Sequence, residues 1–199
     1  MKIAASIWLT LVVAALVAMA NFSNTPGDTR AAPDQWPAPS QIALDSKLPT
    51  LIMFAHPHCP CTQASVGELE VLMANCPGRL NVHVVFVQPV GTTEDWVKTD
   101  LWRRVATIPG VTLHRDDKGV EAQRFRAETS GDTVLYNPQG NLLFAGGITI
   151  SRGHSGDNPG RTAIETILTK GLPSEVKTPV FGCSLFGTEC RAPGASSNP

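Results

Sequence analysis

The sequence predicts an α/β fold of three layers, in which helices cover both faces of a mixed central β-sheet. Short apolar runs typical of strands alternate with helix-forming segments between residues 48 and 172. Early strands that are joined by helices are expected to run parallel, whereas two late strands joined by the turn Asn137–Asn141 must run antiparallel. The expected order of elements is therefore β-α-β-α-β-α-β-β-α, within one domain.

The first half of this domain contains two predicted strands and two predicted helices. Leu51–Ala55 is a continuous apolar run, which is typical of a central strand buried on both faces. The next helix is expected to begin with Pro60 at its first position and to end at Cys76-Pro77-Gly78. Val82–Val87 predicts a second strand, and Thr92–Thr107 predicts a second helix.

Capping and turn residues bound the elements of the second half. Asp117 is expected to cap a helix over Lys118–Ala127, and Asn158 is expected to cap a final helix that ends at Gly171. Three further strands are predicted, at Val111–Leu113, Thr133–Tyr136 and Leu142–Ala145. The last two of these strands form the antiparallel pair.

The N-terminal segment predicts export. Residues 3–20 are uncharged and rich in Ala, Val and Leu, and their number is close to the ~20 residues that span a bilayer. Ala18-Met19-Ala20 also fits the small-x-small pattern of a signal-peptide cleavage site. Residues 1–20 are therefore expected to be a signal peptide or a membrane anchor. Either places the rest of the chain in the periplasm or at the outer face of the inner membrane, and we expect a tethered protein.

Two segments flank the predicted domain. Residues 21–47 contain four prolines and no apolar periodicity, which predicts a Pro-rich tether. Residues 173–199 contain Cys183 and Cys190 and are expected to form a flexible tail. The sequence thus predicts four parts: the exported N-terminus, the tether, the domain and the tail.

Composition excludes some classes of function. The net charge is −1, only 17% of residues are charged, and no block of Lys or Arg occurs, so nucleic acid is not expected as a partner. No Gly-rich phosphate-binding loop occurs in the right context, so no organic cofactor is expected. The five cysteines of an exported chain favour disulfide chemistry instead.

The run His56–Cys61, directly after the first strand, carries most of the reactive side chains. If Pro60 opens the helix, Cys59 is its N-cap, and the free amides and the helix dipole then lower the pKa of the Cys59 thiol. A protonated His58 would act in the same direction. Cys59 is therefore the predicted nucleophile, with Cys61 as its redox partner.

The partner of Cys59 remains open at the level of sequence. A disulfide between Cys59 and Cys61 closes a small ring through Pro60 and should be strained and easily reduced. The alternative is that Cys183 or Cys190 of the tail resolves one of the two thiols. Cys76 lies on the apolar stripe of the first helix and is expected to be a buried, structural thiol.

Two other functions compete with thiol–disulfide exchange. The first is a copper- or zinc-handling protein, because imidazoles and thiols suit Cu(I) and Zn. Its predicted ligands are His56, His58, Cys59 and Cys61. The second is a thiol peroxidase, in which a single activated thiol attacks a peroxide.

The chain resembles the thioredoxin-like superfamily over roughly residues 48–172, and more narrowly the RedB-like group of exported thioredoxin-like proteins. The residues that carry the resemblance are Phe54-Ala55-His56-Pro57-His58-Cys59-Pro60-Cys61-Thr62, the run Asp117–Gly146 with its Ser130-Gly131, Gly146-Gly147-Ile148-Thr149 and Ser151-Arg152-Gly153-His154. The resemblance implies a thioredoxin-like fold and a thiol–disulfide oxidoreductase. Its expected partners are exported proteins that carry a disulfide or a dithiol.

The chain departs from the thioredoxin pattern at three places. It has Cys-x-Cys instead of Cys-x-x-Cys, and Met53 stands where a buried acid is usual. Asp132 replaces the usual cis-proline, at a position that in this superfamily faces the active cysteine. There an acid would raise the pKa of the thiol, accept a proton or ligate a metal. The alternative is an ordinary turn residue after Gly131.

Overall fold

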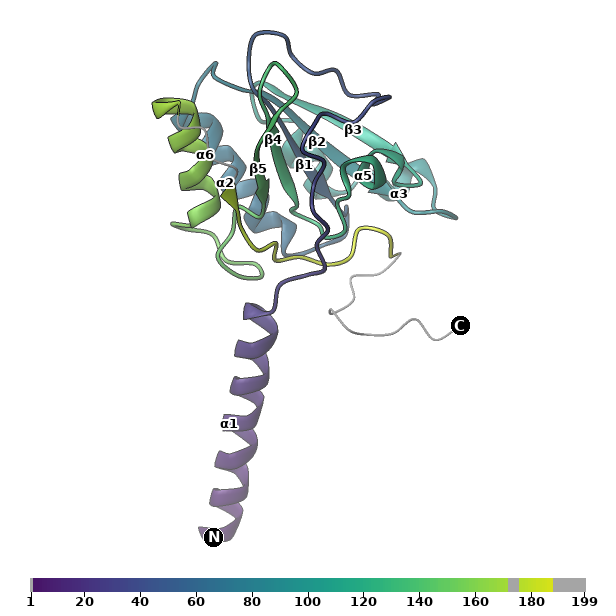
Figure 1. Ribbon diagram of the computed structural model, residues 1–199. Coiled ribbons are helices and arrows are strands. Elements are labelled where there is room, and N and C mark those ends of the chain that lie inside the picture. Colours follow the sequence, from purple (N-terminus) through teal and green to yellow (C-terminus); the bar gives the residue numbers. More distant parts are fainter. Residues whose placement is uncertain (1, 172–175, 188–199) are drawn as a thin grey trace.

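The computed structural model describes residues 2–171 and 176–187. In this part of the chain one mixed sheet contains six strands: β1 (Thr50–Ala55), β2 (Asn81–Gln88), β3 (Val111–Asp117), β4 (Thr133–Tyr136), β5 (Leu142–Gly146) and β6 (Val176–Lys177). The strand order is β3-β2-β1-β4-β5-β6 (Figure 1). β1, β2 and β3 are parallel neighbours, β4 is antiparallel to β1 and β5, and β6 is parallel to β5.

Helices lie on both sides of this sheet. They are α2 (Thr62–Asn75), α3 (Glu94–Val97), α4 (Asp100–Val105), α5 (Val120–Phe125) and α6 (Pro159–Lys170), whereas α1 (Lys2–Asn24) lies apart from the sheet. Every residue of β1 is buried, and alternate residues face opposite layers. Leu51 and Met53 pack in one core with α2, α4 and α6, whereas Ile52 and Phe54 pack in a second core with α5. The predicted three-layer α/β fold with a mixed sheet is confirmed.

The helix predicted over Thr92–Thr107 is wrong, because the structure divides this segment into α3 and α4. Lys98 leaves the helical conformation (φ −77°, ψ 57°). Thr99 then starts a new helix, since its Oγ1 accepts from the amide of Trp102 at 3.4 Å. The same hydroxyl donates to the carbonyl of Pro57 at 3.1 Å, which holds the start of α4 beside the turn that follows β1.

The predicted cap of α5 is wrong, because the N-cap residue is Gly119 and the carboxylate that binds the first-turn amides belongs to Asp116. Asp117 lies in β3, and Asp116 accepts hydrogen bonds from the amides of Glu121 and Ala122, both at 2.9 Å. By contrast, Asn158 caps α6 as predicted, because its Oδ1 accepts from the amide of Arg161 at 2.8 Å. β3 extends past its predicted end and brings Asp116 to the helix.

The N-terminal helix α1 projects away from the domain and buries none of its residues (Figure 1). Its 23 residues correspond to about 35 Å, which exceeds the ~30 Å hydrocarbon thickness of a bilayer. By length and apolar composition it is able to cross a membrane. This agrees with a signal sequence or a membrane anchor.

The Pro-rich tether packs along the domain. Trp36 contacts the rings of Phe125 and Tyr136 edge-on, at centroid distances of 5.0 and 5.3 Å. Ala32 and Ile42 are buried in the same core as α5. These apolar side chains have no helical or strand period, yet they fix the tether to the sheet.

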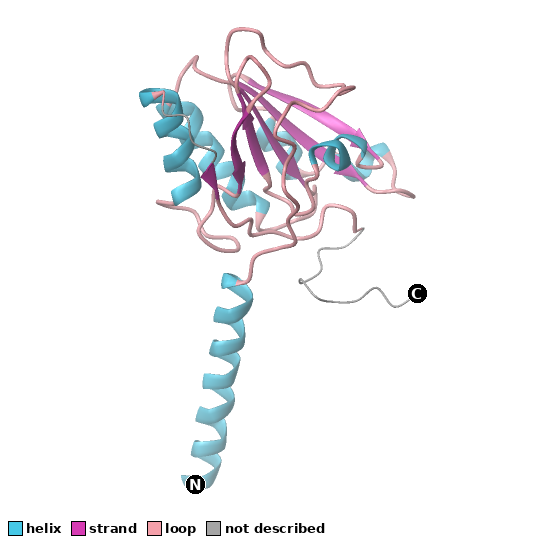
Figure 2. Cartoon of the chain, viewed as in Figure 1, coloured by secondary structure: helices cyan, strands magenta, loops and turns pink. Residues whose placement is uncertain are grey.

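The segment after α6 also packs on the domain. We call residues 176–187 the strap; apart from β6 it is loop (Figure 2). Val180, Cys183 and Leu185 of the strap are buried. The flexible tail predicted from residue 173 onwards is therefore wrong for the strap, because its apolar side chains enter the core and β6 extends the sheet. The rest of that tail, with Cys190, lies outside the described residues.

Candidate active site

The turn between β1 and α2 places Cys59 and Cys61 at the end of the central strand. Hydrogen bonds between residues three apart close this turn: the amide of Thr62 donates to the carbonyl of Cys59 at 3.2 Å, and that of Gln63 to Pro60 at 3.3 Å. Regular helix begins at Thr62, with Cys61 as its N-cap residue and no side-chain cap hydrogen bond. The prediction that Cys59 is the N-cap is thus wrong, because a tighter 3₁₀-type turn precedes the helix.

Three thiols meet at this turn. The side chain of Cys61 is hydrogen-bonded to the sulfurs of Cys183 and Cys59, and these bonds, together with burial, raise the pKa of the Cys61 thiol above its usual range. Cys59 and Cys183 are only 2% and 7% exposed, whereas Cys61 is partly exposed. The raised pKa favours the protonated form of the Cys61 thiol. Of the two predicted alternative resolving thiols, the structure brings Cys183 to the site.

Ser130 connects the three segments that build the site. Its hydroxyl oxygen accepts from the amide of His56 at 2.7 Å and lies 2.6 Å from the hydroxyl of Thr62. Its own amide donates to the carbonyl of Cys183 at 2.8 Å. The serine is fully buried, so these bonds are shielded from water. Sequence analysis noted Ser130 only within the Ser130-Gly131 motif of the resemblance and gave it no role.

His56 is a neutral imidazole in this arrangement. Its Nδ1 accepts from the amide of His58 at 3.2 Å, and its Nε2 lies 2.9 Å from the carbonyl oxygen of Gly187. Because a carbonyl only accepts, Nε2 carries the proton and Nδ1 does not. Burial lowers the pKa of His56, against the opposing effects of the Gly187 bond and of a charge on Cys59. Both ring nitrogens are thus engaged.

His58 contacts α3. Its Nε2 lies 2.9 Å from the carbonyl of Trp96, and its ring packs on the Trp96 ring at 4.4 Å. In the part of the chain that the structure describes, no group of three or more His, Cys, Asp and Glu side chains has the arrangement of a metal site. The alternative ligand set of His56, His58, Cys59 and Cys61 is therefore not gathered in this structure.

Asp132 lies beside the site but faces another cavity. The backbone carbonyl of Asp132 accepts a hydrogen bond of 2.8 Å from the amide of Phe54 in β1. Asp132 lines a cavity of about 250 Å³ with Ala145, Thr178 and Val180, and none of the four cysteines that the structure describes lines that cavity. Burial raises the pKa of Asp132 to about 7. The expectation that Asp132 faces the active cysteine finds no support in these contacts.

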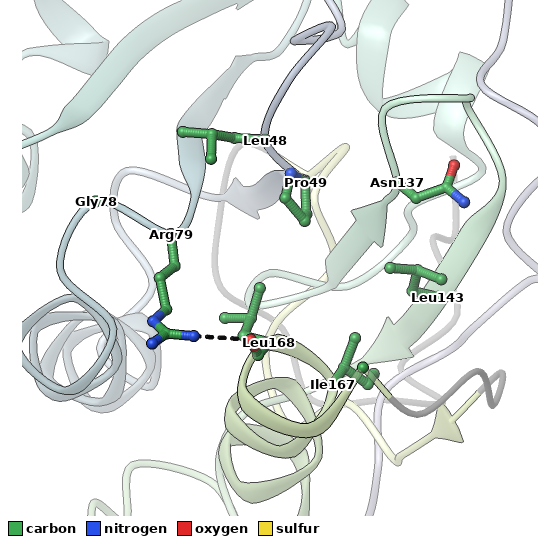
Figure 3. Close-up of a pocket in the computed structure, with 9 residues that line it drawn as sticks. Leu48, Pro49, Gly78, Arg79, Asn137, Leu143, Ile167 and Leu168 are labelled. Atoms are coloured by element: carbon green, nitrogen blue, oxygen red, sulfur yellow. Dashed lines mark hydrogen bonds between the residues drawn. The ribbon is translucent and has the colours of Figure 1, made fainter.

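A second cavity lies at the opposite end of β1. It has a volume of about 440 Å³, and Figure 3 shows mainly apolar side chains around it. The guanidinium of Arg79 donates to the carbonyl of Leu168 at 3.2 Å at its edge. No cysteine lines it; its lining is Leu48, Pro49, Gly78, Arg79, Asn137, Leu143, Ile167, Leu168 and Gly171. The reactive thiols and this apolar cavity thus occupy different ends of the sheet.

The order and direction of the strands identify the fold. A parallel β1-α2-β2 unit is followed by the antiparallel β4-β5 pair and α6, in the spatial order β2-β1-β4-β5. The fold is thioredoxin-like. A thioredoxin-like fold carries its cysteines at the turn after the central strand, and Cys59 and Cys61 occupy that place here.

Solved structures agree with this assignment of the fold. The chain is similar over 83% of its length to an uncharacterized conserved protein from Geobacillus kaustophilus, with 18% identity, 93% of that chain covered and a TM-score of 0.59. It is also similar over 83% to a hypothetical protein from Sinorhizobium meliloti 1021, with 17% identity, 96% of that chain covered and a TM-score of 0.58. Both likenesses concern the fold. No protein-family model and no curated protein matches the chain.

Proposed function

We propose that the protein is an exported, membrane-tethered thiol–disulfide oxidoreductase that acts through Cys59, with Cys61 as its partner. The observation that carries the proposal is the hydrogen bond between the two sulfurs at the turn after β1. A buried sulfur beside a second thiol that holds a proton has the two groups that disulfide exchange requires.

The chemistry follows from the roles of the two thiols. The Cys59 thiolate attacks a substrate disulfide, forms a mixed disulfide and expels one substrate thiolate. Cys61, whose raised pKa favours the protonated thiol, then attacks the mixed disulfide, and its proton passes to the second substrate sulfur as that group leaves. The Ser130 hydrogen bonds hold the turn and the start of α2 in place while the sulfurs exchange partners. The proposed reaction uses no metal and no organic cofactor.

The proposed location follows from α1. The helix is long and apolar enough to remain in the inner membrane, with the domain on the periplasmic side. The partners are then exported proteins that carry a disulfide or a dithiol. Residues 1–47 fused to a reporter that is active only after export test this location. Activity confined to the cytoplasm would exclude it, and N-terminal sequencing distinguishes an anchor from a cleaved signal.

The decisive experiment compares two cysteine variants of the full-length chain in detergent. Cys59→Ser should abolish both the reduction of a model protein disulfide and the oxidation of a reduced peptide. The matched control Cys76→Ala removes a buried thiol at the other end of α2 and should retain activity. Equal activity of Cys59→Ser and the unaltered protein would end the redox assignment. Metal content measured on the same preparation tests the copper or zinc alternative.

A further inference from the structure

The strap covers the thiol site. The amide of Leu185 donates to the carbonyl of Glu128 at 2.9 Å, and Thr129 and Ser184 form an isolated antiparallel bridge. Together with the bond from Ser130 to the carbonyl of Cys183, these contacts hold the strap against the loop before β4. Figure 1 shows the strap crossing the end of the domain that faces α1.

The strap fits this place closely. A Cβ atom on Gly182 would lie 1.9 Å from the carbonyl oxygen of Ser130, so only glycine allows this approach. Beyond Cys183, the carbonyl of Gly187 accepts from Nε2 of His56. Strap residues on both sides of Cys183 therefore contact the residues that build the site, which fixes the Cys183 sulfur beside Cys61.

We propose that Cys183 is a third redox thiol of this site, and that the stable disulfide formed in a turnover joins Cys61 to Cys183. The inference rests on the proposed function and adds which two cysteines are joined by a disulfide at the end of a turnover. The Cys61 side chain is hydrogen-bonded to both Cys59 and Cys183, so it is able to exchange a disulfide with either of them.

Ring strain favours the Cys61–Cys183 disulfide over the Cys59–Cys61 disulfide. A disulfide between Cys59 and Cys61 closes a ring through Pro60, and Cys61 holds a helical backbone conformation (φ −65°, ψ −29°). A disulfide between Cys61 and Cys183 joins two segments that are distant in sequence, so no small ring forms. It also ties the strap to α2, a long-range link that restricts the unfolded chain. Exchange should therefore proceed from the first bond to the second.

The three steps balance in atoms and electrons. The Cys59 thiolate attacks the substrate disulfide and expels one substrate thiolate. The Cys61 sulfur attacks Cys59, which expels the second substrate thiolate. The Cys183 sulfur then attacks Cys61, which expels Cys59 as a thiolate again. The protons of Cys61 and Cys183 pass to the two released thiolates, so the substrate disulfide is reduced and these two thiols are oxidised. A dithiol reductant of the same compartment returns the protein to its starting state.

Disulfide mapping tests the proposal on the unaltered full-length chain. The reduced protein receives one equivalent of oxidised glutathione, is alkylated, and is digested after Arg and Lys and then after Phe, which separates Cys183 from Cys190. We expect a Cys61–Cys183 peptide pair, with Cys59 alkylated. A predominant Cys59–Cys61 bond, or a bond to Cys190, would overturn the proposal while leaving the oxidoreductase activity in place.

Two variants separate a catalytic thiol from a packing residue. In Cys183→Ser the first attack by Cys59 should persist, but the reaction should stop at the Cys59–Cys61 disulfide. Glutathione should reduce this disulfide at least about tenfold more readily than the Cys61–Cys183 disulfide of the unaltered chain. Gly182→Ala keeps the thiol and displaces the strap, so it should show the same change. The control Ser184→Ala alters an exposed strap residue and should behave as the unaltered chain.

If Cys183→Ser recovers an alkylatable Cys59 as fast as the control, Cys183 has no part in the reaction. If Cys59→Ser is also active, the proposed function itself fails.

Discussion

The helix α2 has a cysteine at each end; burial raises the pKa of both thiols, but their neighbours differ. At its start, the Cys61 side chain is hydrogen-bonded to two other sulfurs, and Ser130, His56 and Thr62 form a buried polar network at the same turn. At its end, Cys76 lies in the apolar core, and burial together with the charge of Glu165 raises the pKa of its thiol. The dipole of the helix favours a thiolate only at the first end. Position in the fold, more than residue type, therefore decides which cysteine reacts.

The strongest test of this difference is the variant Cys61→Ser. Without the second thiol at the start of α2, a mixed disulfide at Cys59 should persist, and its lifetime should rise at least about tenfold. Non-reducing electrophoresis with a disulfide-bearing partner measures the trapped complex. An untrapped variant would show that a tail cysteine attacks Cys59 directly, without Cys61 as intermediary.

The pH dependence of stability tests whether Asp132 belongs to the reactive end. Its pKa is 3.8 when exposed and about 7 in the folded protein, so between these values the folded state binds more protons than the unfolded state. The free energy of unfolding should therefore fall as pH rises from about 4 to about 7, by at most about 4 kcal/mol for such a shift.

Asp132→Asn should remove this fall and make the protein more stable at pH 7, as urea unfolding at several pH values would measure. The pH profile of thiol alkylation at Cys59 should stay unchanged, because Asp132 lines a cavity that no cysteine among the described residues lines. A shifted alkylation profile would place Asp132 in the reactive group.

Ser130→Ala tests how much the buried hydrogen bonds at the start of α2 contribute to stability. The change leaves the amide of His56 and the hydroxyl of Thr62 without their buried partner, which should cost about 1–3 kcal/mol of stability. Denaturant unfolding measures the loss. The exposed Ser184→Ala is the control and should change stability by less than about 0.5 kcal/mol. Equal stability of the two variants would mean that water replaces the Ser130 bonds.

The smallest effect is expected at the opposite end of the helix. Cys76→Ala should cost about 1–2 kcal/mol, because it leaves a small cavity in the core, and it should spare activity. Unfolding and exchange assays on the same preparation check both parts. Rapid labelling of Cys76 by a polar thiol reagent in the native protein would contradict the contrast between the two ends.

The sequence predicted those features that depend on local patterns. The apolar run after Leu51 predicted the central strand, and the Asn137 turn and the Asn158 cap lie where expected. The sequence offered Cys183 and Cys190 as alternative resolving thiols but could not choose between them, because the contact joins distant segments and no periodic pattern marks the strap. The break at Lys98 depends on a bond from Thr99 to Pro57 in another segment, which is equally invisible in the local sequence.

Arg152 connects the end of α1 to the strap. Its guanidinium donates to the carbonyls of Thr25 and Gly182, and its amide donates to the carbonyl of Ser23 in the last turn of α1. The end of the proposed anchor and the strap next to Cys183 are therefore joined through one buried side chain. With α1 in the bilayer, a large globular substrate would meet the lipid surface before it reached the thiols. Proteins held in the same membrane would instead encounter the site by lateral diffusion, at the raised effective concentration that confinement gives. The anchor would then determine which disulfides are reached.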